Sequence, residues 1–103
     1  MNQVTHIWKV PLRMKIWRSR EAYIGIIDDV ATIELLQPYI GRRVILEIMG
    51  VSINARLTRF PEKGMVYIAI FLPRRLAPTW EQLRQKGEYH KATVVITEGS
   101  SHG

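Results

Sequence analysis

The sequence predicts a small α+β protein that is mainly β: a curled antiparallel or mixed sheet, or barrel, of about six strands with two short helices. Three observations lead to this expectation. The chain has 103 residues, the size of one domain. Apolar and polar residues alternate along several short segments, which is the period of a half-buried strand. Only two segments combine a helix start signal with helical spacing and a stop signal.

The first predicted strand covers residues 8–17. Every second residue is apolar: Trp8, Val10, Leu12, Met14 and Ile16. The residues between them form an outward row that is mostly cationic: Lys9, Pro11, Arg13, Lys15 and Trp17. Because a proline cannot donate a ladder hydrogen bond, we expect this strand to lie at a sheet edge or to carry a bulge at Pro11.

A turn at 18–21 leads to a second strand at 22–27, which Gly25 interrupts. Asp28 or Asp29 is a suitable N-cap for a short helix that ends before Pro38. Strands at 44–48 and 51–58 follow, separated by Gly50 in the pattern of a hairpin.

A second tight turn is predicted at 60–64, because it contains Pro61 and Gly64. The continuous apolar run 65–72 predicts a strand buried on both faces. A second helix begins at Pro78 and Thr79, with Gln82 completing a possible capping box, and ends at Gly87. The last strand spans 92–96.

We expect one domain over residues 5–97 and a disordered tail at 98–103, which is small and polar. The N-terminal residues lack the apolar run of a signal peptide. The longest apolar run has eight residues, whereas a membrane-spanning helix needs ~20. The chain has no cysteine, which excludes disulfides and thiolate metal sites. A cytoplasmic protein without a membrane partner is therefore expected.

The layout of the second half resembles a known group of folds. A strand at 67–73, a helical segment at 76–87 and a strand from His90 are similar to the cradle-loop barrels, which include the AbrB-like and double-psi barrels. Gly87-Glu88 stands where the AbrB-like family has an acidic Gly-Asp. The resemblance implies a small barrel, and no functional residue is carried over from it. In size and charge the chain also resembles small basic proteins of archaeal ribosomes and chromatin.

No catalytic pattern is present. The serines do not form a nucleophile elbow, and the three histidines, His6, His90 and His102, lack metal-ligand spacing. His90 is expected to be a surface or core residue at a strand start. The pair Asp28-Asp29 could hold magnesium, although a helix cap explains it better. No phosphate-binding glycine loop occurs. The sequence therefore predicts a protein that is not an enzyme and needs no cofactor.

Charge gives the main functional signal. Fifteen Lys and Arg residues against nine Asp and Glu leave a net charge of +6, and ten of the fifteen are arginine. Such an excess attracts polyanions, and the guanidinium group suits phosphate. The candidate contact residues fall into four groups: Lys9, Arg13 and Lys15 with Trp17; Arg56, Arg59 and Lys63; Arg18 and Arg20; and Arg74 with Arg75. Arg42 and Arg43 could join them, or Arg43 could pair with Glu47.

We expect a structural RNA-binding protein, namely a small ribosome-associated component of a thermophilic archaeon that contacts ribosomal RNA and other ribosomal proteins. The alternatives are a DNA-binding chromatin or AbrB-like transcription protein, and a non-catalytic protein-interaction subunit. The last would use an exposed apolar patch drawn from Trp8, Trp17, Trp80 and Tyr39. Nucleic-acid binding requires that cations from distant segments converge on one side of the folded chain.

Overall fold

A computed structural model describes residues 5–99. They form seven strands: β1 (Thr5–Ser19), β2 (Ala22–Ile27), β3 (Arg43–Ile48), β4 (Val51–Arg56), β5 (Thr58–Glu62), β6 (Met65–Leu72) and β7 (His90–Gly99). The two α-helices are α1 (Val30–Leu36) and α2 (Ala77–Lys86). Short 3₁₀ turns at Gln37–Tyr39 and Arg74–Leu76 flank them. The expected class, α+β and mainly β, is confirmed.

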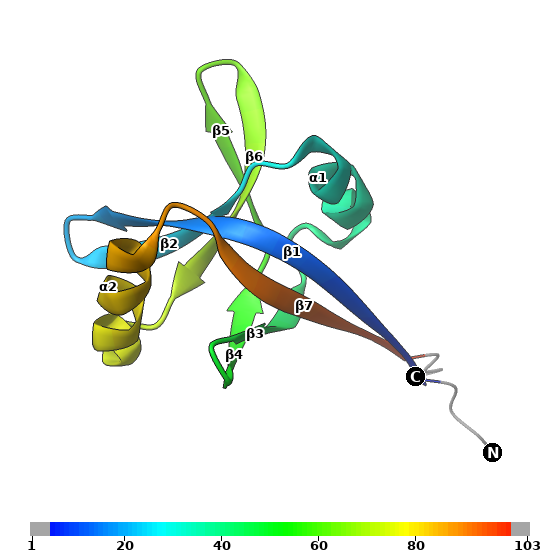
Figure 1. Ribbon diagram of the computed structural model, residues 1–103. Coiled ribbons are helices and arrows are strands. Elements are labelled where there is room, and N and C mark those ends of the chain that lie inside the picture. Colours follow the sequence, from blue (N-terminus) through cyan, green and yellow to red (C-terminus); the bar gives the residue numbers. More distant parts are fainter. Residues whose placement is uncertain (1–4, 100–103) are drawn as a thin grey trace.

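The strands form one curled, entirely antiparallel sheet in the order β4-β3-β7-β1-β2-β6-β5 (Figure 1). The 15-residue strand β1 belongs to both halves of this half-barrel. Its first part, Thr5–Met14, pairs with β7, and its second part, Lys15–Ser19, pairs with β2. We call β4-β3-β7-β1 the first half-sheet and β1-β2-β6-β5 the second half-sheet.

The core fills the inside of the curl. Along β3 the residues alternate strictly, with Val44, Leu46 and Ile48 buried and the residues between them exposed. Leu12, Met14 and Ile16 of β1 are also buried, whereas Trp8 in the same row is half exposed. Helix α2 packs Trp80 and Leu83 against this core, and the Trp80 indole N–H donates to the carbonyl of Pro73 at 2.8 Å. His90 is a buried core residue.

Local signals placed several turns and caps correctly. Asp29 is the N-cap of α1 and accepts a hydrogen bond from the Thr32 N–H, and Gly87 is the C-cap of α2. The β3–β4 turn places Met49 and Gly50 at positive φ, as in tight hairpins, so the glycine is used as predicted. The capping box of α2 was wrong, because the helix begins at Ala77, directly after a 3₁₀ turn, and has no side-chain cap.

Three strand predictions need correction. The segment 51–58 is two strands that separate at Leu57. The expected turn at 60–64 contains the end of β5, and only Lys63 and Gly64, both at positive φ, form the hairpin turn. Strand β6 is buried on both faces only at its centre, since Met65 and Phe71 are exposed. Side-chain pattern alone could not separate these strands, because it does not reveal which partner each one pairs with.

The sheet edge expected along the first strand exists only at the part of β1 that contains Pro11. Strand β1 lies in the middle of the sheet, but at Pro11 it pairs with β7 alone, because β2 begins its pairing at Lys15. Strand β7 continues to Gly99, two residues beyond the predicted domain boundary, and Glu98 pairs with His6. The rest of the predicted tail, 100–103, lies outside the described residues.

Candidate functional site

The outer face of the first half-sheet collects cations from four strands. Residues directly opposite one another in an antiparallel pair share a face. The strand registers place Lys9 opposite Val95, Val95 opposite Ile45, and Ile45 opposite Asn54. Alternate residues along each strand therefore share this exposed face. We call its cations the basic face: Lys9, Arg13, Arg43, Arg56 and Lys91.

Carboxylates are scarce on the basic face itself. None of its five cations forms an ion pair within residues 5–99, and Glu47 is the one carboxylate in the registers that build the face. Two neighbours are of like charge: Arg13 lies opposite Lys91, and Arg43 lies opposite Arg56. Such pairs destabilise a sheet. The polar neighbours on the face are hydroxyls and an amide: Ser52, Asn54, Thr93 and Thr97.

Only some of the predicted contact residues reach this face. Lys9, Arg13 and Arg56 do, although the Arg56 guanidinium also donates to the carbonyl of Gly41 at 2.9 Å. Lys15 instead forms ion pairs with Asp28 at 3.4 Å and Glu88 at 3.2 Å.

The other predicted residues lie elsewhere. Arg18 pairs with Glu81 at 3.5 Å. Trp17 packs edge-on against Phe60, with ring centroids 5.9 Å apart. The remaining predicted cations occupy exposed turns or the β5 edge strand: Arg20, Arg59, Lys63, Arg74 and Arg75.

Sequence reasoning missed Lys91 and placed Arg43 in no group. Lys91 alternates with Thr93, Val95 and Thr97 along β7, and this pattern marks an outward row. Its position beside Arg13 follows from the β1–β7 register, which joins the two ends of the chain. Arg43 is not paired with Glu47 in the described structure, so its charge remains available on the face.

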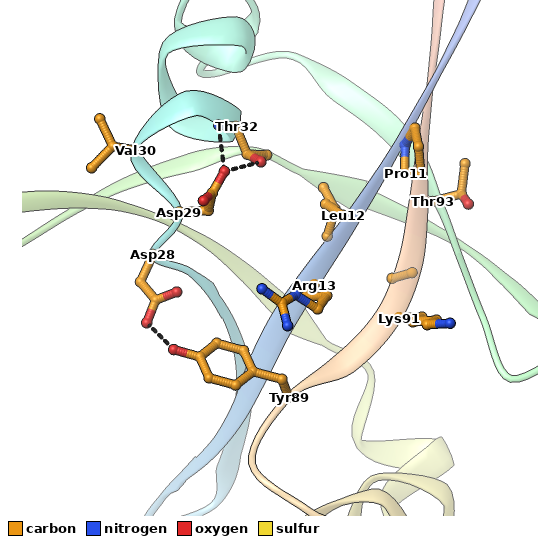
Figure 2. Close-up of a pocket in the computed structure, with 11 residues that line it drawn as sticks. Pro11, Leu12, Arg13, Asp28, Asp29, Val30, Thr32, Tyr89, Lys91 and Thr93 are labelled. Carbon is orange, nitrogen blue, oxygen red and sulfur yellow. Dashed lines mark hydrogen bonds between the residues drawn. The ribbon is translucent and has the colours of Figure 1, made fainter.

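A groove of about 930 Å³ opens beside the basic face, between β1 and the start of α1 (Figure 2). Arg13 and Lys91 line it on the sheet side. Asp28 and Asp29 line it at the start of α1, where Asp29 is turned toward Thr32 and Asp28 toward Tyr89. Tyr89 stands at one end, and its ring lies 5.4 Å from the Arg13 guanidinium carbon and 5.2 Å from the Lys15 Nζ. The groove therefore combines cations, carboxylates and one aromatic ring.

Hydrogen bonds fix the ionisation of the groove. The Thr32 hydroxyl and N–H both donate to Asp29, which lowers the pKa of that carboxyl, and the Arg13 charge lowers it further. The Tyr89 hydroxyl donates to Asp28 at 2.8 Å, which raises the pKa of the phenol. The Glu88 carboxylate raises the pKa of Lys15 above its ordinary value. At neutral pH Asp29 is consequently an anion and Tyr89 a neutral donor.

The outer face of the second half-sheet is different in character. Ile24, Ile26 and Ala69 form a small buried cluster there, and Phe60 and Tyr67 pack against it. Phe71 shares this face, opposite Ile24, and 58% of its surface is exposed. We call this surface the apolar face. Trp17 belongs to it by register, opposite Ile24.

Comparisons with protein-family models, curated proteins and solved structures found no match to this chain. Within the described residues, no three His, Asp or Glu side chains lie together as a metal site would require. The longest helix described, α2, has ten residues and is too short to span a membrane.

Proposed function

We propose that this chain binds nucleic acid through the basic face, with RNA favoured over DNA. The observation that supports the proposal is the convergence of five unpaired cations from β1, β3, β4 and β7. Within residues 5–99, four of the fifteen cations are in ion pairs: Lys15, Arg18, Arg42 and Arg84. A like-charged face that costs stability is expected where a polyanion neutralises it.

The shape of the face favours RNA. Three inter-strand spacings of about 4.8 Å make the face about 14 Å wide before side chains are counted. The major groove of B-DNA is about 12 Å wide and admits a helix or a two-stranded ribbon. A four-stranded face of this width fits a single strand or the wide, shallow minor groove of A-form RNA better. The hydroxyls of Ser52, Thr93 and Thr97 suit ribose and phosphate contacts.

The finer proposal is a structural component of a ribonucleoprotein particle, such as a ribosome-associated protein that contacts ribosomal RNA. Contacts led by the phosphate backbone suit such a role, because they position a protein without reading bases. Co-sedimentation with ribosomal subunits would support this setting, and recovery only from the ribosome-free fraction would count against it.

The binding experiment compares two charge-matched triple variants. Lys9→Gln, Arg43→Gln and Lys91→Gln remove three charges from the basic face, and Arg59→Gln, Arg74→Gln and Arg75→Gln remove three from other surfaces. We measure the affinity for structured RNA and for duplex DNA over a series of salt concentrations. The basic-face variant should lower the salt slope by roughly 2, since each phosphate contact contributes about 0.7 to 0.9.

The control variant should change the slope much less. Equal losses in the two variants would refute the basic face as the contact surface. Tighter binding of duplex DNA than of RNA at every salt concentration would favour the DNA-binding alternative.

A further inference from the structure

The groove beside the basic face contains carboxylates and an aromatic ring, which contacts to phosphate groups do not require. Its volume of about 930 Å³ is within the range of small-molecule sites. Arg13 and Lys91 belong both to the groove and to the basic face, so a nucleic-acid strand bound on the face would pass its mouth. A base turned away from the strand would enter between β1 and the start of α1 (Figure 2).

The helix side of the groove presents hydrogen-bond acceptors. The Oδ2 atom of Asp29 is held by Thr32, at 2.9 Å from the N–H and 2.7 Å from the hydroxyl. The Oδ2 atom of Asp28 is held by the Tyr89 hydroxyl and by Lys15. Within the described residues the second oxygen of each carboxylate makes no hydrogen bond. Because Asp29 already caps α1, the helix end contributes side-chain acceptors and not backbone donors.

Beside Asp28 the groove also presents flat groups. The Tyr89 ring is 41% exposed, and the Arg13 guanidinium lies 5.4 Å from its centre. Aromatic rings and guanidinium planes are the usual stacking partners of unpaired bases. The hydrogen bond to Asp28 holds the Tyr89 ring at the groove. A planar ligand is therefore favoured over a spherical one.

The two carboxylates decide which part of a nucleotide enters. A phosphate would be repelled by Asp28 and Asp29, whereas a base edge with N–H donors would satisfy them. Guanine carries two adjacent donors, N1–H and the N2 amine. Adenine and cytosine place a ring-nitrogen acceptor beside their single amine, and uracil flanks its one N–H with two carbonyls. A carboxylate accepts only, so it discriminates against the last three.

We propose that this groove selects an unpaired guanine base of the bound RNA, with Asp28 and Asp29 as acceptors and Tyr89 and Arg13 as stacking partners. The proposal rests on the proposed function, because the basic face must hold the strand. It adds base selectivity to a surface that otherwise contacts only the backbone.

The experiment measures fluorescence anisotropy of labelled oligouridylates that carry one central guanine, adenine, cytosine or inosine. Guanine should bind about tenfold tighter than adenine, in line with a paired hydrogen-bond contact to a base. Inosine lacks the N2 amine and should fall between the two. The double variant Asp28→Asn, Asp29→Asn should reduce the guanine preference to less than about twofold. Each amide replaces one carboxylate oxygen with an N–H donor, and the guanine N1–H and N2 amine cannot accept from it. Asparagine at 29 retains the helix cap.

The matched control is Glu21→Gln, Glu34→Gln, which removes two exposed carboxylates outside the groove. It should tighten binding of every oligonucleotide alike and keep the preference for guanine. A second variant, Tyr89→Leu, should weaken guanine binding while it leaves the salt slope unchanged.

Equal affinity for all four oligonucleotides, with the salt slope still dependent on the basic face, would overturn base selection and leave the proposed function intact. A lack of binding to any of them and to structured RNA would overturn both.

Discussion

The two outer faces of the half-barrel differ in the side chains that they carry: one is mainly polar and cationic, and the other is mainly apolar. Strand β1 supplies both, because Lys9 and Arg13 lie on the basic face and Trp17 lies on the apolar face. On the first half-sheet most outward residues are polar, its five cations form no ion pair within residues 5–99, and the buried row beneath them contributes to the core. On the second half-sheet Ile26 and Ala69 are buried on the outward side as well, under Phe60 and Tyr67. The outward side of the second half-sheet therefore adds apolar packing, whereas the outward side of the first carries cations without ion pairs among the described residues.

The largest expected effect is at the centre of the apolar face. Ile26 is 1% exposed, so Ile26→Ala should lower the free energy of unfolding by about 3 kcal/mol through lost contacts and a cavity. Ile45→Ala, on the basic face and 38% exposed, should cost less than about 1 kcal/mol. Urea unfolding of both variants measures the difference. Similar losses would show that the two faces share the packing equally.

The second test concerns Trp17, which the sequence placed among the contact residues. Trp17→Leu should lower the free energy of unfolding by about 1–2 kcal/mol, because it removes the edge-on contact with Phe60. RNA affinity of the folded variant should stay within about twofold of the parent. An affinity loss of about tenfold or more, measured under conditions where the variant is folded, would restore Trp17 as a stacking platform for bases.

A smaller effect should separate binding from stability on the basic face. Lys91→Glu replaces a like-charged neighbour of Arg13 with an opposite one, which should stabilise the fold by about 0.5 kcal/mol at low salt. The gain should shrink in high salt because the pair is exposed. RNA binding should weaken at the same time, as an anion enters the face. Arg74→Glu serves as the control, because Arg74 has no such neighbour across a strand pair. Thermal unfolding of both variants shows whether each substitution raises or lowers the stability.

The smallest effect concerns Glu81, a carboxylate that neutralises two cations. The Tyr23 hydroxyl donates to Glu81, which also pairs with Arg84 and Arg18, and these contacts lower the pKa of the Glu81 carboxyl. A lowered pKa stabilises the fold above the ordinary value of 4.5, and this contribution is lost as the pH falls through the folded value. Glu81→Gln should therefore reduce stability at neutral pH and match the parent in strong acid. A constant difference at every pH would contradict this account.

Several elements were predictable from local signals. The alternation in β1 and β3, the cap at Asp29 and the glycine at the β3–β4 turn are set by neighbours in sequence. The division at Leu57 was not, because Leu57 continues the apolar alternation of β4. What separates the strands is a pair of backbone hydrogen bonds between Leu57 and the 41–42 segment: its N–H donates to the Arg42 carbonyl, and its carbonyl accepts from the Gly41 N–H.

The candidate site was predictable only in part. Charge and alternation identified Lys9, Arg13 and Arg56. Placing Lys91 on the same face required the β1–β7 register. Lys15 was predicted as a contact residue, but it forms ion pairs with Asp28 and Glu88. The alternation of residues along one strand cannot reveal ion pairs with distant segments of the chain. The groove was equally hidden, because Asp28 and Tyr89 meet through a contact that spans 61 residues of chain.

The sequence by itself determined the class of the fold, its excess of positive charge and which residues of β1, β3 and β4 face outward. These properties follow from composition and from a side-chain period that is local to each strand. Only the tertiary structure decided which outward residues share a face and which cations meet a carboxylate. The physical reason is that strand register and sheet order depend on how the whole core packs, and a short stretch of chain does not contain that information.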